Sequence, residues 1–161
     1  MTLTELPFNF PGKVFRSAMP FCYFDPENTI FDAYKTVGID MVVMLTSDDE
    51  AQKQSGLNLR EFYKKAGMDV LYHPIIDFST PADSAAFSDA VDMAFQQILD
   101  GKNIVIHCYA GIGRTGMFAA LMARRILGLS GDDAIKWVRK FIPEAVQTPE
   151  QRQIILLNAG K

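Results

Sequence analysis

Residues 105–116 read VIHCYAGIGRTG, and this stretch decides how the rest of the chain is interpreted. The apolar, β-branched run at 103–107 predicts a buried strand. A glycine-containing loop follows and leads into an almost wholly apolar stretch at 114–127, which predicts a buried central helix. The order of strand, glycine loop and helix is typical of α/β proteins, in which ligands bind beyond the carboxyl ends of the strands.

The loop is suited to binding an anion. A helix N-terminus offers N–H groups without partners and the positive end of the helix dipole. Gly111, Gly113 and Gly116 allow the backbone to curl so that successive N–H groups converge on one point, and a phosphate dianion fits such a cradle. The candidate phosphate-binding residues are Tyr109, Ala110, Gly111, Ile112, Gly113 and Arg114.

Cys108 and Arg114 give this cradle its chemistry. Cys108 lies at the bottom of the loop, where the N–H groups that bind phosphate also stabilise a thiolate. A thiolate facing a bound phosphorus atom is a positioned nucleophile. The guanidinium of Arg114 can bind two phosphate oxygens at once and follow them into the transition state. A lone cysteine can also be a small buried hydrophobe, but the fixed spacing of Cys, Gly, Arg and Thr favours the reactive interpretation.

Strands alternate with helices along the rest of the chain. We expect an irregular arm at 1–12, a short edge strand at 13–16, and further strands at 40–46 and 69–74. We expect helices at 27–37 and 58–66, and after N-caps at Ser47, Thr80, Ser130 and Thr148. The fold class is therefore α/β: a single domain over 1–161 with a central, mostly parallel sheet of about four to five strands flanked by helices.

Composition excludes several classes of partner. The net charge is −3, and neither a basic patch nor a basic balance is present, so we expect no nucleic-acid partner. No apolar run reaches membrane-span length and no signal peptide is visible, so we expect no membrane association. The only cysteines and histidines are Cys22, Cys108, His73 and His107, which leaves no zinc cluster. We expect no metal, no cofactor, and a monomer in the reducing cytoplasm.

The cradle matches the H-C-x5-R-[S/T] signature, and the chain resembles the protein tyrosine phosphatase superfamily. It is most similar to the small dual-specificity phosphatases, and within them to the kinase-associated phosphatases. Three further stretches support the resemblance, at 18–22 (AMPFC), 73–77 (HPIID) with Thr80-Pro81, and 146–148 (VQT). The resemblance covers roughly 13–157 and implies the cysteine phosphatase fold.

The resemblance also implies roles for single residues. Asp77 is expected to protonate the leaving oxygen and then to activate water, through a phosphocysteine intermediate on Cys108. Thr115 would hydrogen-bond the departing thiolate, His107 would fix the conformation of Cys108, and Gln147 would place the water. Asp83 competes with Asp77, but its position better fits a helix cap.

Plainer alternatives stay open for three residues. Asp77 could be a turn residue that hydrogen-bonds its own backbone, and Gln147 could be a surface loop amide. Cys22 could be a half-buried residue after a turn. Because a second thiol can trap an oxidised cysteine as a disulfide, Cys22 could also be a redox partner of Cys108.

The loop residues between Cys108 and Arg114 include no basic side chain, which argues against phosphoinositide and RNA triphosphate substrates. We therefore expect a phosphoprotein substrate carrying phosphotyrosine, phosphoserine or phosphothreonine. Two other functions remain in contention. One is a phosphoprotein-binding module with little turnover, and the other is a phosphatase of a small metabolite or lipid headgroup.

Overall fold

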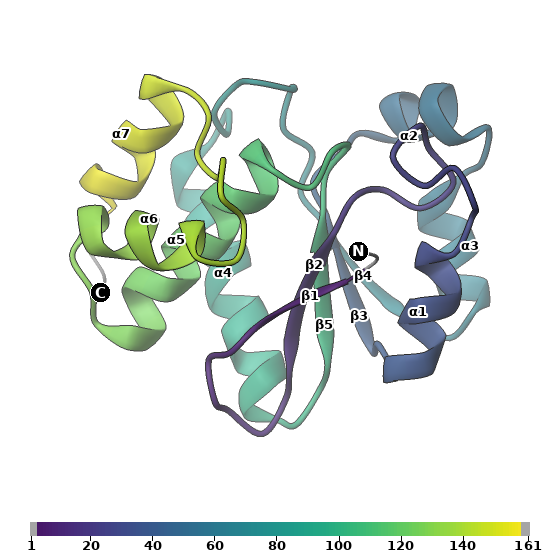
Figure 1. Cartoon of the computed structure of the whole chain (residues 1–161), viewed down its shortest axis with the longest axis horizontal. Coiled ribbons are helices and arrows are strands. Elements are labelled where there is room, and N and C mark those ends of the chain that lie inside the picture. The colour runs from purple at the N-terminus through teal and green to yellow at the C-terminus, as the bar shows by residue number, and fades with distance from the viewer. Residues whose placement is uncertain (1–2, 159–161) are drawn as a thin grey trace.

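The computed structural model describes residues 3–158 and is built around one five-stranded sheet (Figure 1). The strands are β1 (Thr4–Leu6), β2 (Val14–Ser17), β3 (Met41–Met44), β4 (Asp69–Tyr72) and β5 (Ile104–His107). Their order is β1-β2-β5-β3-β4, with β1 antiparallel to β2 and the other four parallel. The carboxyl ends of the four parallel strands therefore meet at one edge, with β5 between β2 and β3.

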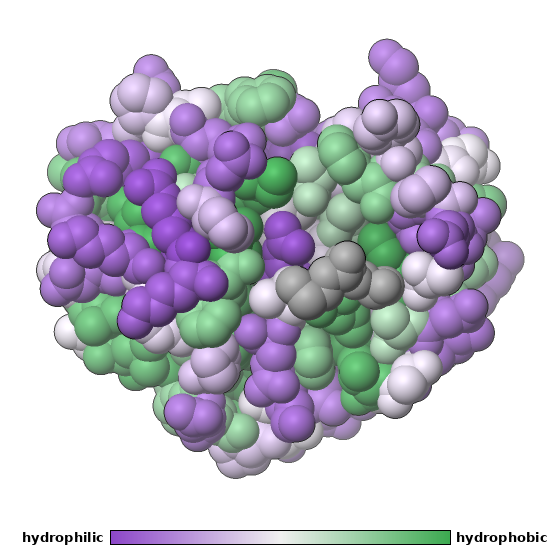
Figure 2. All heavy atoms as spheres, viewed as in Figure 1, coloured by the Kyte–Doolittle hydropathy of each residue, from purple (hydrophilic) through white to green (hydrophobic). Residues whose placement is uncertain are grey.

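Helices cover both faces of the sheet. One face carries α1 (Ile30–Val37), α2 (Asp48–Ser55) and α3 (Leu59–Lys65), and the other carries α4 (Ser84–Leu99), α5 (Gly113–Leu127), α6 (Gly131–Arg139) and α7 (Pro149–Leu157) (Figure 1). Buried α5 packs against α4, α6 and α7. On the face drawn in Figure 2, hydrophilic residues gather over α6 and α7, as expected for the outer side of this layer. Within 3–158, no helix is both long and apolar enough to cross a bilayer.

The two central strands are buried on both faces. Val42 and Val105 point into the core beneath α1 and α3, whereas Val43 and Ile106 point into the core beneath α4 and α5. A one-residue slip would exchange these two sets of side chains, so burial on both faces fixes the register of the strands. The position of the end of β5, which Cys108 follows, is fixed with it.

The α/β fold class and the strands predicted at 40–46, 69–74 and 103–107 are confirmed. Strands β3 and β5 are buried along their whole length, whereas the edge strand β4 is only partly buried. The caps expected at Ser47, Ser130 and Thr148 are also present, since each side-chain oxygen accepts an N–H three residues ahead, at 3.0, 3.1 and 3.1 Å. Gly38 ends α1 in the left-handed conformation, with φ of 73°. Local sequence signals therefore placed most of the element boundaries.

Three boundary predictions are wrong. The arm at 1–12 contains β1, which is only three residues long and shows no periodicity, and its pairing makes β2 an interior strand. Helix α1 begins at Ile30, because Asn28 takes a left-handed φ of 56° and interrupts the pattern. Helix α4 begins at Ser84, and its N-cap is Asp83, whose Oδ1 accepts the Ala86 N–H at 3.0 Å. Thr80 is therefore not the N-cap of α4.

Candidate active site

The loop between β5 and α5 lies at the carboxyl edge of the sheet. Gly111 takes a φ of +78°, and a Cβ built on it would lie 2.3 Å from the carbonyl oxygen of Ser17 at the end of β2. A Cβ on Gly116 would lie 2.5 Å from that of Ala145, beneath the first turn of α5. Glycine is required at both positions because neighbouring backbone approaches so closely.

Cys108 is buried at this loop, and its sulfur is hydrogen-bonded. Thr115 Oγ1 donates to Cys108 Sγ across 3.1 Å, as expected for a residue that stabilises a thiolate. His107 Nδ1 lies 2.9 Å from the Cys108 carbonyl oxygen, and its Nε2 lies 2.8 Å from Tyr63 Oη. Because a carbonyl only accepts, the neutral ring donates through Nδ1 and accepts the Tyr63 hydroxyl at Nε2. His107 therefore restrains the backbone of Cys108.

His107 makes the stability of the fold depend on pH. Burial lowers the pKa of His107 to about 4, from an ordinary value of 6.5. Between these two pH values the unfolded chain binds a proton that the folded protein does not, so stability falls as the pH drops from 6.5 to 4. We expect this residue to contribute about 3 kcal/mol to that fall.

Urea unfolding at a series of pH values measures this effect. His107→Gln should be less stable than wild type at pH 7, but its stability should fall less steeply below the ordinary histidine pKa of about 6.5. The difference between the two curves isolates His107 from carboxylates that titrate in both proteins. Parallel curves would contradict the assignment.

Arg114 is almost fully buried, and its guanidinium is held by an ion pair. Nη1 and Nη2 donate to Glu50 Oε1 and Oε2 at 2.7 and 2.8 Å, and Nη1 also donates to the Ile75 carbonyl at 2.8 Å. Burial lowers the pKa of Arg114, but hydrogen bonding to Glu50 and nearby negative charges outweigh it, so the pKa is raised. Nε has no hydrogen-bond partner within residues 3–158 and remains available for a ligand.

Glu50 is a site residue that sequence reasoning missed. The pattern Ser47-x-x-Glu50 predicts a capping box, in which the glutamate side chain would bind the backbone N–H of the N-cap residue. The N–H of Glu50 does donate to Ser47 Oγ, but its carboxylate binds Arg114 instead. The available signal was an acidic residue just beyond β3, the strand next to β5.

Asp77 lies at the same edge of the sheet, in the loop that follows β4. Its Oδ1 is 3.3 Å from Arg114 Nη2, and its side chain is 43% exposed. The same oxygen accepts the Phe78 N–H at 3.0 Å, so the turn interaction foreseen as an alternative coexists with placement beside Arg114. Asp83 caps α4.

Gln147 and Gln151 link three parts of the site. A Cβ on Gly113 would lie 2.2 Å from Gln147 Oε1, so the Gln147 side chain lies directly against the cradle. Gln151, fully buried, accepts the Gln147 N–H at 2.9 Å and donates to the Ser79 carbonyl at 3.0 Å. The pattern Thr148-Pro149-x-Gln151 predicts only a helix cap, yet Gln151 connects the Asp77 loop to the segment before α7.

Cys22 lies on the other side of the sheet from Cys108. Cys22 belongs to the core that contains α1 and α3, and Cys108 to the core that contains α4 and α5. Cys22 Sγ accepts the Phe24 N–H at 3.3 Å and lies 3.9 Å from the carbonyl oxygen of Tyr109. Burial raises the pKa of the Cys22 thiol. It is therefore next to the cradle loop, but it is protonated at neutral pH.

Apolar side chains form a rim around the cradle loop and the Asp77 loop. Tyr23, Ile76 and Phe78 are 80%, 80% and 62% exposed. Phe24 packs edge-on against both Tyr23 and Tyr109, with ring centroids 5.3 and 5.1 Å apart. These five residues are called the apolar rim below. Large exposed apolar groups of this kind often mark a binding surface.

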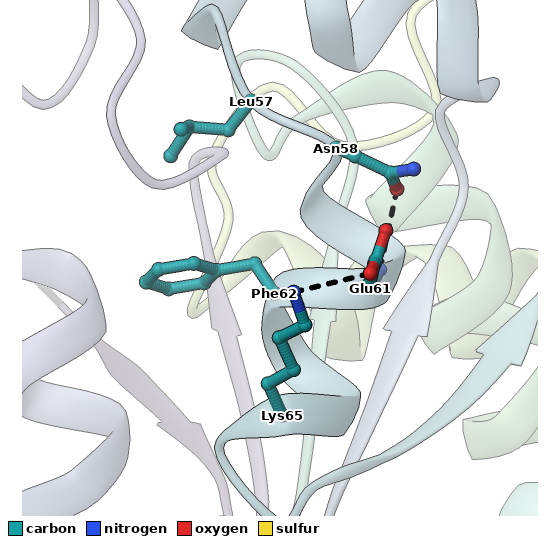
Figure 3. Close-up of a pocket in the computed structure, with 5 residues that line it drawn as sticks. All are labelled: Leu57, Asn58, Glu61, Phe62 and Lys65. Atoms are coloured by element: carbon teal, nitrogen blue, oxygen red, sulfur yellow. Dashed lines mark hydrogen bonds and ion pairs between the residues drawn. The ribbon is translucent and has the colours of Figure 1, made fainter.

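Two cavities lie near α2 and α3. One, of about 240 Å³, lies between the start of α2 and the Asp77 loop and is lined in part by Glu50 and Asp77. The other, of about 200 Å³, is lined by Leu57, Asn58, Glu61, Phe62 and Lys65 (Figure 3). Its charged groups, Glu61 and Lys65, pair with each other at 3.1 Å, and it shares no residue with the cradle. Within 3–158, no group of three His, Cys, Asp or Glu side chains could hold a metal ion.

Comparison with known proteins places this site in context. Residues 24–126 match the family model "Polymorphic toxin system, DSP-PTPase phosphatase". The chain is 28% identical to tyrosine-protein phosphatase cdc-14 of Caenorhabditis elegans, over 93% of this chain and 19% of that protein. It is 29% identical to cyclin-dependent kinase inhibitor 3 of Mus musculus, over 83% of this chain and 65% of that protein. The chain thus spans from 19% to 65% of the length of these relatives.

Solved structures share the fold. Tk-PTP in its active form is 28% identical and superposes with a TM-score of 0.77, covering 94% of this chain and 93% of that one. Kinase associated phosphatase, with its catalytic-site cysteine replaced by serine, is 24% identical and superposes with a TM-score of 0.84. That match covers 95% of this chain and 90% of the other.

Proposed function

Because the chain belongs to the DSP-PTPase phosphatase family, we propose that it hydrolyses phosphate monoesters through a covalent phosphocysteine on Cys108. One observation carries the proposal. The Cys108 thiol, hydrogen-bonded to Thr115, lies at the N-terminus of α5, where the buried Arg114 has an Nε without a hydrogen-bond partner within residues 3–158. We propose one catalytic domain over 1–161, acting as a monomer in a reducing cytoplasm, where Cys108 would stay reduced. Size-exclusion chromatography and cell fractionation test the last two points.

The first step transfers the phosphoryl group to the enzyme. The Cys108 thiolate attacks phosphorus, the S–P bond forms, and the bond to the ester oxygen breaks. Asp77, in its protonated form, gives its proton to that departing oxygen. The backbone N–H groups of the cradle and the Nε and Nη2 groups of Arg114 stabilise the charge on the equatorial oxygens. Glu50 keeps the guanidinium in the orientation that this requires.

The second step regenerates the enzyme. Asp77, now a carboxylate, takes a proton from water as the water oxygen attacks phosphorus. The S–P bond breaks, inorganic phosphate leaves, and the Thr115 hydroxyl stabilises the returning thiolate. The location of Gln147 against Gly113 supports a role in orienting the water. No metal or cofactor enters either step.

A phosphorylated protein side chain is the proposed substrate. The cradle residues between Cys108 and Arg114 are uncharged, and the apolar rim presents aromatic and aliphatic surface around them. Such a surface suits the side chain and neighbouring residues of a phosphopeptide. The apolar rim and the cradle residues between Cys108 and Arg114 offer no cation for the additional phosphates of an inositol headgroup.

Hydrolysis assays test the proposed function. The protein should release phosphate from p-nitrophenyl phosphate and from phosphotyrosine, phosphoserine and phosphothreonine peptides, with full activity in EDTA. Loss of activity in EDTA would contradict the mechanism. A phosphopeptide that binds without being cleaved would indicate a binding module instead. Cleavage of small phosphate esters or lipid headgroups with no cleavage of any peptide would overturn the protein substrate.

Asp77→Asn should lower kcat for phenyl phosphate by about 10²- to 10⁴-fold, because the poor leaving group needs a proton. The loss should be much smaller for an ester with an acidic leaving group, such as a fluorinated coumarin. The matched control is Asp83→Asn in the same loop, since asparagine is an equally good N-cap and activity should persist. Equal losses on both esters would contradict the assignment of Asp77 as the acid.

We also propose that Cys22 is the thiol that captures oxidised Cys108. Its contact with Tyr109, the residue after Cys108, supports a short path, although the two thiols belong to different cores and the loop must move. The step joins the sulfenic acid of Cys108 to the Cys22 thiol and releases water. Non-reducing peptide mapping after inactivation by peroxide decides the matter, because a protein inactivated without a Cys22–Cys108 link would refute the proposal.

A further inference from the structure

Strand β2, which pairs with β5, holds the cradle loop from one side through hydrogen bonds. At the end of β2, the backbone N–H of Met19 donates to the Tyr109 carbonyl at 2.9 Å. The Arg16 side chain donates to the Gly111 carbonyl through Nε at 3.1 Å and Nη2 at 2.7 Å. Two carbonyl groups of the cradle are therefore held from the β2 side of the loop.

Because the peptide bonds are trans, fixing these carbonyl groups also fixes the direction of the N–H groups that follow them. The C=O of one residue and the N–H of the next point in opposite directions, so a carbonyl held toward β2 directs the following N–H away from it. Held in this way, the Tyr109 and Gly111 carbonyls turn the N–H groups of Ala110 and Ile112 away from β2. Gly111 is the position with the most backbone freedom, because only glycine takes its φ of +78° without strain.

We propose that Arg16 is a positioning residue, which fixes the Gly111–Ile112 peptide so that its N–H stabilises the transferring phosphoryl group. This inference rests on the proposed function and adds a residue to its machinery. A guanidinium suits the task because its fork places two N–H groups on one acceptor, which a lysine cannot reproduce. Burial lowers the pKa of Arg16, and the negative charge of Cys108 opposes that shift, so the guanidinium and the reacting sulfur interact electrostatically.

Arg16→Met tests the proposal. Loss of one preorganised donor should lower kcat by about 10²- to 10³-fold, because such donors act mainly in the transition state. KM and the inhibition constant of inorganic phosphate should change far less than that of vanadate, whose five-coordinate geometry resembles the transition state. Arg16→Lys keeps the charge but not the fork, and should recover only part of kcat.

Arg124→Met is the matched control. Arg124 also donates to two backbone carbonyls, those of Ile155 and Leu156 at 2.7 and 2.9 Å, but it does so at the far end of α5. It should match Arg16→Met in lost stability and retain wild-type kcat and vanadate inhibition. If Arg16→Met does not fold, Arg16→Lys alone supplies the ratio of vanadate to phosphate inhibition.

The outcomes separate two failures. A wild-type chain that hydrolyses no phosphate ester would overturn the proposed function. A wild-type chain that turns over, with Arg16 variants that keep its kcat and its ratio of vanadate to phosphate inhibition, would overturn only the role of Arg16. Equal weakening of phosphate and vanadate would also overturn it, since that pattern indicates a general loss of the binding site.

Discussion

Cys108→Ser is expected to lower kcat by on the order of 10⁴-fold or more, because a serine hydroxyl is not ionised at neutral pH and attacks phosphorus poorly. The substitution removes the nucleophile and leaves the rest of the cradle in place. The glycine backbone, Arg114 and the ion pair with Glu50 do not depend on the sulfur. The variant should therefore still bind inorganic phosphate, measured by calorimetry, while releasing no burst of p-nitrophenolate.

Cys22→Ser is the control for this experiment. It makes the same atomic change at the other cysteine, which contacts the cradle loop at the Tyr109 carbonyl. It should hydrolyse p-nitrophenyl phosphate at close to the wild-type rate. A Cys108→Ser protein that keeps more than a small fraction of wild-type turnover would show that water is activated directly and that no phosphocysteine forms.

The centre of the fold could be predicted from the sequence because its signals are local. An apolar strand, a glycine loop and a helix that follow one another define the position of Cys108, Thr115 and Arg114 within a few residues. The caps at Ser47 and Ser130 are equally local, since each joins atoms three positions apart. Such contacts are encoded in short patterns and survive tertiary packing.

The partners of the cradle could not be predicted in the same way. Glu50 binds Arg114 across 64 positions of sequence, and Arg16 binds Gly111 across 95. Only the order of the strands in the sheet brings these residues together. Glu50 also carries a misleading local signal, because its N–H donates to the N-cap Ser47 while its carboxylate binds Arg114. Strand β1 was missed because it carries no local signal, since three residues are too few to show a strand periodicity.

Arg114→Lys should lower kcat by about 10³-fold. The guanidinium binds the two oxygens of Glu50 and the Ile75 carbonyl, and still has Nε free for phosphate. A lysine ammonium in the same buried position has no planar fork, so it cannot bind Glu50 at two points and the phosphoryl oxygens at once. Steady-state kinetics with p-nitrophenyl phosphate measures the loss, and Arg60→Lys, in the half-buried ion pair with Asp48, controls for the change of cation.

A double-mutant cycle with Glu50→Gln shows whether the carboxylate acts through Arg114. Glutamine keeps the shape of Glu50 but loses the charge that holds the guanidinium, so the single variant should lose kcat. In an Arg114→Lys background there is no fork left to orient, and the same change should cost much less. Losses that multiply independently would mean that Glu50 contributes by another route, such as the cavity it lines with Asp77. Strong coupling would show that the first turn of α2 acts on the chemistry at the end of β5 through one partly buried ion pair.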